Sequence, residues 1–311
     1  MTDRAVTDRI VLSHTGSQRT LEAIPELAAK HRADVVTLTL QFGSEKDLEE
    51  VRDRALAAGA VRAHVLDVAG EFVSDYLVHA LKADALDVEG GTVDALMSVV
   101  TARKLVDIAH IEGAMSVAHG VAGGRNRLEV ALRALDPTLT VIAVPGDPGP
   151  VASPAAPLRI ESPAEPALVD ISFTCGEPTA INGVTMPLVE LLDSLGMIAG
   201  AHGIGRAAGR APALLVLSAA HLKLKALSGT DDGTDDLGGM MEEVTRHYAD
   251  IIAKGLWFSR FREALDAFVD KTQERLNGVV RLKLFKADCQ AIDVAQAPTT
   301  GRMLPLVGTR D

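Results

Sequence analysis

The stretch Arg9–Ser17, RIVLSHTGS, joins a short apolar run to a turn that contains glycine. Its first five residues predict a β-strand, and the segment from Arg19 to Ala29 has the apolar spacing of a helix. A second apolar run, Val35–Leu40, follows this helix. A strand, a helix and a further strand in this order predict a parallel pair joined by a right-handed crossover.

The same alternation continues through the first half of the 311-residue chain. The further expected elements are a helix at 45–58, a strand at 61–67, a helix through Lys104 and Ile108, and strands at 115–119 and 139–144. We therefore expect an α/β fold with a doubly wound parallel sheet. Ligands of such sheets bind beyond the carboxyl ends of the strands, so a site is expected in the turns after Ser13, Leu40 and His119.

A change of composition marks a boundary between Pro145 and Pro166, where seven of the 14 prolines lie among Gly, Ala and Ser. This composition is typical of a stiff linker. The expected division is an α/β domain at 1–146, a Pro-rich linker at 147–168 and a second α+β domain at 169–311. The elements expected in the second domain are strands at 169–174, 178–181, 214–218 and 279–285, helices at 188–197, 240–253 and 261–276, and a loop at 229–239.

The charge balance and the cysteine content exclude several classes of protein. Lys and Arg total 31 against 42 Asp and Glu, a formal net charge of -11, which argues against a nucleic-acid or anionic-membrane partner. Cys175 and Cys289 are isolated, which excludes a disulfide scaffold and a cysteine-based zinc cluster. No apolar run approaches the roughly 20 residues of a membrane span, and the first residues lack the apolar stretch of a signal peptide, so we expect a cytoplasmic protein.

Several stretches resemble argininosuccinate synthase. GAHGIGR at 200–206 stands where that family has G-K-H-G-V-G-R, and GLWFS at 255–259, REALDAF at 262–268 and GVVRLKL at 278–284 resemble its C-terminal region. KDLEE at 46–50, EFVSDY at 71–76 and VAHG at 117–120 extend the resemblance into the first half. The resemblance therefore covers almost the whole chain in order.

This resemblance implies a fold, an assembly and a reaction. It implies an adenine nucleotide alpha hydrolase-like, Rossmann-like first domain, a synthetase-like second domain, and a C-terminal helix that forms a homotetramer. The family joins citrulline to aspartate, using ATP to adenylate the ureido oxygen and releasing AMP and pyrophosphate. The implied partners are small molecules and further copies of the chain.

The turn after the first strand departs from the family pattern. The family has S-G-G-L-D-T-S, which holds pyrophosphate and whose acid helps to organise the metal-bound phosphates. Here the matching residues are 15–21, TGSQRTL, in which Thr15, Gly16, Ser17 and Thr20 still predict an anion nest at a helix N-terminus. Arg19 replaces the acid and reverses the charge. The cofactor is left open, because the resemblance implies magnesium-ATP whereas Arg19 argues against the metal.

The substrate residues of the family are also replaced. Its A-L-Y, whose tyrosine meets citrulline, is ALD at 85–87, and its L-A-R-P matches a segment at 97–100 without arginine. Its G-x-T-G-K-G-N-D-Q-V-R-F-E matches a stretch from Gly120 to Glu129 that is three residues shorter and keeps Asn126 and Arg127. The citrulline-binding serines expected after residue 144 and the citrulline-binding loop expected after residue 206 are missing. Since each unsatisfied buried partner costs about 1–3 kcal/mol, citrulline–aspartate ligation is not expected.

The candidate catalytic residue is His14, as a general base or a ligand contact. The candidate ligand- or nucleotide-binding residues are Thr15, Gly16, Ser17, Thr20, Gln41, His119, Gly120, Asn126 and Arg127. No metal ligand is assigned. In the alternative interpretation, His14 only replaces a tyrosine of the family, His119 belongs to the scaffold, the turn is a strand-to-helix connection with hydroxyl caps, and Arg125 to Arg127 are solvated.

Two further patterns have structural interpretations. Asp231–Asp236 lacks the alternating ligand spacing of a calcium loop and is predicted to be a solvated loop. The aromatic and leucine residues of 257–268 follow a helical stripe, which predicts a core or a subunit interface rather than a ligand site.

Three hypotheses for function follow. The first is a repurposed homologue that binds or transforms a different small molecule in the crevice at the carboxyl ends of the strands, without a requirement for ATP. The second is a non-catalytic paralogue that acts as an oligomeric partner. The third is an ATP-dependent, AMP-forming carbon–nitrogen ligase with altered substrates.

Overall fold

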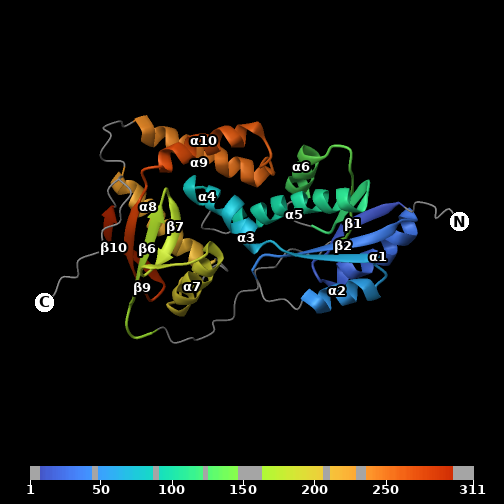
Figure 1. Cartoon of the computed structure of the whole chain (residues 1–311), viewed down its shortest axis with the longest axis horizontal. Coiled ribbons are helices and arrows are strands. Elements are labelled where there is room, and N and C mark those ends of the chain that lie inside the picture. Colours follow the sequence, from blue (N-terminus) through green and yellow to red (C-terminus); the bar gives the residue numbers. More distant parts are fainter. Residues whose placement is uncertain are drawn as a thin grey trace. The chain divides into compact units, whose positions relative to one another are not determined.

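A five-stranded parallel sheet forms the first half of the fold (Figure 1). This computed structural model describes residues 8–43, 48–86, 91–121, 125–145, 163–205, 211–228 and 236–296. The strands are β1 (Arg9–Ser13), β2 (Asp34–Gln41), β3 (Arg62–Asp67), β4 (Ser116–His119) and β5 (Thr140–Ala143). Their order is β3-β2-β1-β4-β5 and all four pairings are parallel, which confirms the predicted α/β class.

Helices cover both faces of this sheet (Figure 1). They are α1 (Gln18–His31), α2 (Leu48–Ala57), α5 (Gly91–Glu112) and α6 (Arg125–Leu135), with α3 (Ala69–Phe72) and the π-helical turn η1 (Val73–Leu77) before α5. Ile10 and Leu12 pack in one core with α1 and with Ala55 of α2. Val11 packs in a second core with α5 and α6. The alternation of side chains along β1 thus assigns one pair of helices to each face.

The compact units are discontinuous along the chain. The first consists of Met1–Leu77, Gly90–Pro154 and Arg246–Glu263, and the second of Val78–Glu89, Ala155–Thr245 and Ala264–Asp311. Most residues of the linker expected at 147–168 lie outside the described residues, and the homotetramer expected through a C-terminal helix concerns contacts between chains. Those two expectations therefore stay predictions.

Aromatic packing holds the segment 246–263 within the first unit. Trp257 is 2% exposed, and its ring stacks on Tyr76 with centroids 5.2 Å apart. The guanidinium of Arg262 lies 4.7 Å from the Trp257 ring centroid, a cation–π contact. Gly255 has a φ of 73°, and a Cβ atom there would lie 2.1 Å from the carbonyl oxygen of Arg127. Only glycine allows this approach, so the backbone at Gly255 lies directly against the backbone of α6 at Arg127.

The second unit contains an antiparallel sheet in the order β10-β9-β6-β7-β8. Its strands are β6 (Ala167–Thr174), β7 (Glu177–Ile181), β8 (Val184–Thr185), β9 (Gly278–Phe285) and β10 (Asp288–Gln296). The remaining helices among the described residues are α4 (Val78–Lys82), α7 (Leu188–Ala201), α8 (Pro212–Ser228), α9 (Asp236–Lys254) and α10 (Arg260–Gln273).

One predicted element is wrong. Residues 214–218, expected as a strand, lie inside α8. A short apolar run fits a buried strand and a buried helix equally well, and the run continues as helix through Ser228. β10 was not expected from the sequence and pairs antiparallel with β9. The predicted loop at 229–239 is only partly described, and α9 begins at Asp236 within it.

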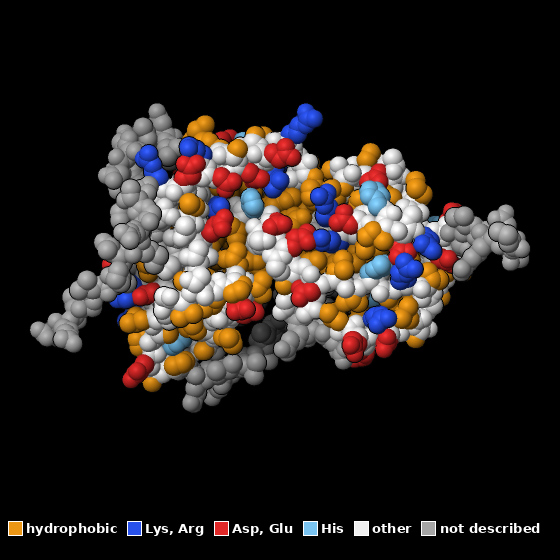
Figure 2. Space-filling model, viewed as in Figure 1, with side chains coloured by type: hydrophobic (Ala, Val, Ile, Leu, Met, Phe, Trp, Pro, Cys, Tyr) orange, Lys and Arg blue, Asp and Glu red, His pale blue; other side chains and the backbone are white. Residues whose placement is uncertain are grey.

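The surface shows mixed charge. On the face in Figure 2, Asp and Glu side chains lie among Lys and Arg side chains. None of the helices in the described part of the chain is both long and apolar enough to cross a membrane.

A buried carboxylate ties together the amino-terminal edge of the first sheet. The Glu112 side chain is 1% exposed and accepts hydrogen bonds from Arg9 Nη1 at 3.0 Å, Arg62 Nη1 at 2.7 Å and His64 Nε2 at 2.7 Å. Burial alone would raise the pKa of Glu112, but the bonds from His64 and Arg62 outweigh it and hold this pKa below its usual range.

We expect Glu112→Gln to lower the free energy of unfolding by about 2–3 kcal/mol, because the two arginines and His64 lose their shared anion. Urea denaturation of the full chain measures this change. Glu26→Gln, at an exposed position of α1, is the matched control and should stay within about 0.5 kcal/mol of wild type. Equal losses in the two variants would contradict a specific role for Glu112.

Candidate functional site

The candidate site begins at the turn between β1 and α1, beside the point where the strand order reverses. The His14 amide donates to the carbonyl oxygen of Leu38 at 2.8 Å, which extends the β1–β2 pairing by one residue. Gly16 follows with a φ of 82°, and a Cβ atom there would lie 3.2 Å from Val51 Cγ2 of α2. Both the positive φ and the close contact favour glycine.

Ser17 starts α1 as its N-cap, in agreement with the predicted turn. The Thr20 amide donates to Ser17 Oγ at 3.3 Å, and Thr20 Oγ1 donates to the Ser17 carbonyl oxygen at 3.0 Å. The two hydroxyl oxygens are 3.1 Å apart. Arg19, in the first turn of α1, is exposed, and this turn contains no acidic residue. The first turn of α1 therefore carries a positive charge, and the Glu22 carboxylate in the next turn accepts a hydrogen bond from Gln18 Nε2 at 3.0 Å.

His14 is buried next to this cap. Its side chain places Nδ1 2.8 Å from Thr20 Oγ1, and the residue is 2% exposed. Nε2 is buried and has no hydrogen-bond partner among the described residues. Burial, and after it the charge of Arg54, lower the pKa of His14 from 6.5 to about 4. The imidazole is therefore neutral at physiological pH, and it is a weak general base.

The predicted residues at the ends of β2 and β4 are placed as follows. Gln41, the last residue of β2, is half-buried, and its carbonyl oxygen accepts from the Val68 amide at 2.9 Å. His119 ends β4, is 0% exposed, and has Nε2 3.7 Å from Glu129 Oε1 of α6. Gly120 follows it and is half-buried.

His14 and His119 end neighbouring strands but lie toward opposite faces of the sheet. Ser13 pairs with His119 across β1 and β4. His14 contacts Thr20 of α1 on one face, whereas His119 approaches Glu129 of α6 on the other. The two imidazoles therefore flank the switch point instead of facing each other.

Asn126 and Arg127 lie in the first turn of α6, where Asn126 is exposed and Arg127 is half-buried. In the part of the chain that the structure describes, neither side chain is bonded to the turn at 14–17. Residues 122–124 and the side chain of Arg125 lie outside the described part. The assignment of Asn126 and Arg127 as ligand-binding residues therefore stays a prediction.

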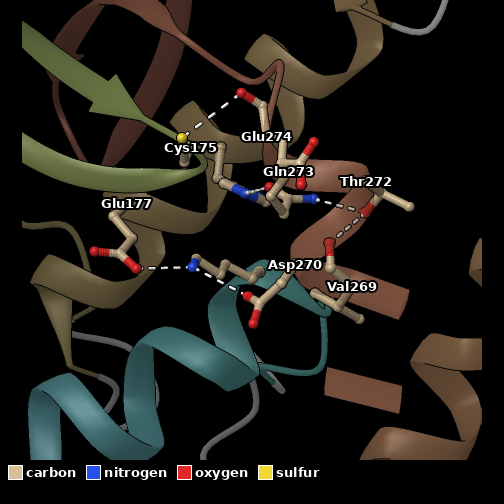
Figure 3. Close-up of polar contacts among 9 residues, drawn as sticks. Cys175, Glu177, Val269, Asp270, Thr272, Gln273 and Glu274 are labelled. Carbon is tan, nitrogen blue, oxygen red and sulfur yellow. Dashed lines mark hydrogen bonds and ion pairs between the residues drawn. The ribbon is translucent and has the colours of Figure 1, made fainter. Parts of the chain in front are cut away.

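A second cluster of polar side chains, in the second unit, was not indicated by the sequence (Figure 3). Lys82 of α4 is almost buried, and its Nζ atom donates to Glu177 Oε1 at 2.7 Å and to Asp270 Oδ1 at 3.3 Å. Burial alone would lower the pKa of Lys82, but the bond to Glu177 and the two carboxylate charges raise it. Lys82 is therefore a charged structural anchor between α4, β7 and α10.

His221 of α8 extends this cluster. Its Nδ1 atom lies 3.2 Å from Asp84 Oδ1, and its Nε2 atom lies 3.0 Å from Gln273 Oε1. Lys225 also bonds to the Asp84 carboxylate. Both ring nitrogens of this 0% exposed histidine are engaged within the protein. The cluster thus holds elements together and leaves no polar atom of His221 for a ligand. The sequence has no local signal for these contacts, because they join α4, β7, α8 and α10, which are far apart in the chain.

Comparison with known protein families gives a match in each half of the chain. A family model described as "Arginosuccinate synthase N-terminal HUP domain" matches residues 9–147, and one described as "Arginosuccinate synthase C-terminal domain" matches residues 156–296. The chain belongs to the argininosuccinate synthase family. The resemblance seen in the sequence is thereby confirmed, and the first parallel sheet is the family's HUP domain.

Two relatives illustrate the extent of the similarity. The argininosuccinate synthase of Caldanaerobacter subterraneus subsp. tengcongensis is 33% identical, over 90% of this chain and 84% of its own length. That of Bacillus thuringiensis is also 33% identical, over 89% of this chain and 85% of its own. The first match extends over 352 residues, more than the 311 of this chain, so the relative has segments inside the matched region that this chain lacks.

The residues of the turn are suited to binding a phosphate group but not to binding a magnesium ion. A positive-φ glycine and the N-terminus of a 14-residue helix provide backbone amides for an anion. Magnesium in phosphate sites is usually held by one or two carboxylates together with phosphate and water oxygens, and residues 18–21 provide no carboxylate. Arg19 at this place repels a cation. The turn therefore fits the anion of the family's cofactor but does not fit its metal.

We expect the free energy of unfolding to fall as pH decreases from about 6.5 toward 4. In this range the unfolded chain protonates His14 while the folded chain keeps it neutral, because its folded pKa is about 4. This difference between the folded and unfolded pKa of His14 corresponds to a loss of about 3 kcal/mol in the free energy of unfolding at pH 4. Urea denaturation at a series of pH values measures the slope.

The comparison variant is His14→Asn. Between pH 6 and 4.5 its free energy of unfolding should depend less on pH than that of wild type, because unfolding takes up about one proton fewer. His31→Gln, at an exposed position at the other end of α1, should keep the wild-type slope. Parallel curves for wild type and His14→Asn would show that His14 is not the buried neutral group.

Proposed function

We propose that this member of the argininosuccinate synthase family binds a small molecule by an oxyanion at the N-terminus of α1, without magnesium, and that it does not join citrulline to aspartate. The proposed ligand carries a phosphoryl or carboxylate group. The proposed function is therefore that of a repurposed homologue that keeps the family scaffold.

The observation that carries this proposal is the turn at residues 14–19. Gly16 and Ser17 keep the geometry of an anion-binding helix start, with a φ of 82° at Gly16 and Ser17 as the N-cap. Arg19 follows as an exposed cation in the same turn. A helix N-terminus and a guanidinium both favour a negative group, and their effects add at one place.

The residues that differ from the family pattern support the loss of the original substrates. Asp87 stands where the family has its citrulline-binding tyrosine, and Ala122 stands where it has a threonine of the aspartate-binding stretch. The segments that the first relative has and this chain lacks agree with the shorter stretch from Gly120 to Glu129. A pocket built to pair charged groups loses about 1–3 kcal/mol for each missing partner, so several losses abolish specific binding.

The chemistry available at the turn is binding rather than acid–base catalysis. The imidazole of His14 is buried, and its low pKa makes it a poor proton acceptor at neutral pH. Thr15, by contrast, is exposed and offers a hydroxyl beside the backbone amides. Arg19 adds a positive charge in the same turn.

The test is calorimetric titration of the full chain with inorganic pyrophosphate and with succinate, each with and without magnesium chloride. We expect pyrophosphate or succinate to bind in the absence of magnesium, and added magnesium not to strengthen binding. Arg19→Gln should weaken binding about fivefold to tenfold, which corresponds to roughly 1–1.4 kcal/mol.

Lys30→Gln is the matched control, because it removes one exposed cation at the other end of the same helix. Its affinity should stay within about twofold of wild type. Binding that requires magnesium, together with release of AMP and pyrophosphate from ATP in the presence of amine or ureido substrates, would contradict the proposal. That result would favour an AMP-forming ligase with altered substrates.

A further inference from the structure

The hydrogen bonds around Thr20 allow an assignment of the proton on each atom. Thr20 Oγ1 has one proton and two lone pairs, and it has three neighbours: the Ser17 carbonyl oxygen at 3.0 Å, Ser17 Oγ at 3.1 Å and His14 Nδ1 at 2.8 Å. The carbonyl oxygen can only accept. If Thr20 Oγ1 donates to it, both of the other neighbours must donate to Thr20 Oγ1.

This arrangement is self-consistent at every atom. Ser17 Oγ donates its proton to Thr20 Oγ1 and accepts from the Thr20 amide at 3.3 Å. His14 then carries its proton on Nδ1, and its Nε2 atom is unprotonated and has a lone pair. In the opposite tautomer, a buried Nε2–H group would have no acceptor among the described residues. A buried donor without an acceptor is rarer and costlier than a buried lone pair, so the first arrangement is favoured.

The arrangement also determines which groups are left for a ligand. The hydroxyl protons of Ser17 and Thr20 are both committed within the turn, and the His14 amide is committed to Leu38. Thr15 is exposed and has a hydroxyl, and the first backbone amides of a helix have no partner within that helix. An anion at this turn is therefore recognised mainly by backbone amides. The contact between His14 Nδ1 and Thr20 Oγ1 stabilises the conformation of that backbone.

We propose that His14 is a positioning residue: its Nδ1–H group donates to Thr20 Oγ1, and this bond fixes Ser17 and Gly16 in the conformation that binds an oxyanion. The inference rests on the proposed function for its ligand, but its tautomer can be tested without one. It assigns to His14 a role different from that of general base, since Nε2 is buried and does not face solvent.

The first test is the nitrogen NMR spectrum of the full chain labelled at histidine, with the His14 signals identified by their loss in His14→Asn. We expect Nδ1 in the protonated range and Nε2 in the unprotonated range at pH 7. In Thr20→Val the acceptor is gone, so the tautomer should change, whereas Thr20→Ser should keep it. Nε2 protonated in the wild-type chain would overturn the inference.

The second test is the affinity for inorganic pyrophosphate, with succinate as the carboxylate probe. His14→Asn retains a donor close to the position of Nδ1 and should stay within about threefold of wild type, whereas His14→Leu should weaken binding about tenfold or more. Thr20→Val should lose a similar factor. The double variant His14→Leu/Thr20→Val should lose no more than either single variant, because both remove the same bond.

The two tests separate the possible failures. Additive losses in the double variant, or equal affinities of His14→Asn and His14→Leu, would overturn the positioning role. Absence of pyrophosphate and succinate binding by the wild-type chain would overturn the proposed function, whereas the NMR result would still decide the tautomer. Thermal unfolding of each variant shows whether a loss of affinity accompanies a loss of fold, and His14→Asn provides the folded reference.

Discussion

Burial of β1 on both faces is the constraint on which the first unit depends. Ile10, Val11 and Leu12 are 2%, 0% and 0% exposed, and each faces helices on its own side of the sheet. A shift of the strand by one residue would exchange these two faces, so the register is strongly specified. The turn that follows Ser13 is therefore held at the point where the strand order reverses, which is where such sheets bind ligands.

The chemistry of the site follows from what surrounds that turn. The neutral imidazole of His14 is buried against Thr20, and Arg19 of the same turn is exposed. Because the buried group carries no charge, the burial of His14 does not require an ion pair. Arg19 is exposed in the same turn, and an exposed cation attracts anions at little desolvation cost.

The segment 246–263 shows how a distant part of the chain completes the first unit. Trp257 is buried against Tyr76, and Gly255 allows the backbone to touch that of Arg127. The strong match of GLWFS at 255–259 to the family thus reflects packing in the core of the first unit. The prediction for this stripe was a core or a subunit interface. Trp257 lies in the core, whereas Phe261 of the same stripe is 51% exposed.

The sequence by itself determined the alternation of strands and helices, the parallel sheet, the cap at Ser17 and the family, because periodicity and turn chemistry are properties of neighbouring residues. It did not determine that residues 214–218 are helical, since an apolar run has no preference until its packing partners are present. Only the tertiary structure decided that His14 and His119 lie toward opposite faces, that Lys82 bonds to Glu177, and that His221 contacts Asp84. These outcomes depend on contacts between residues far apart in the chain, which no local pattern encodes.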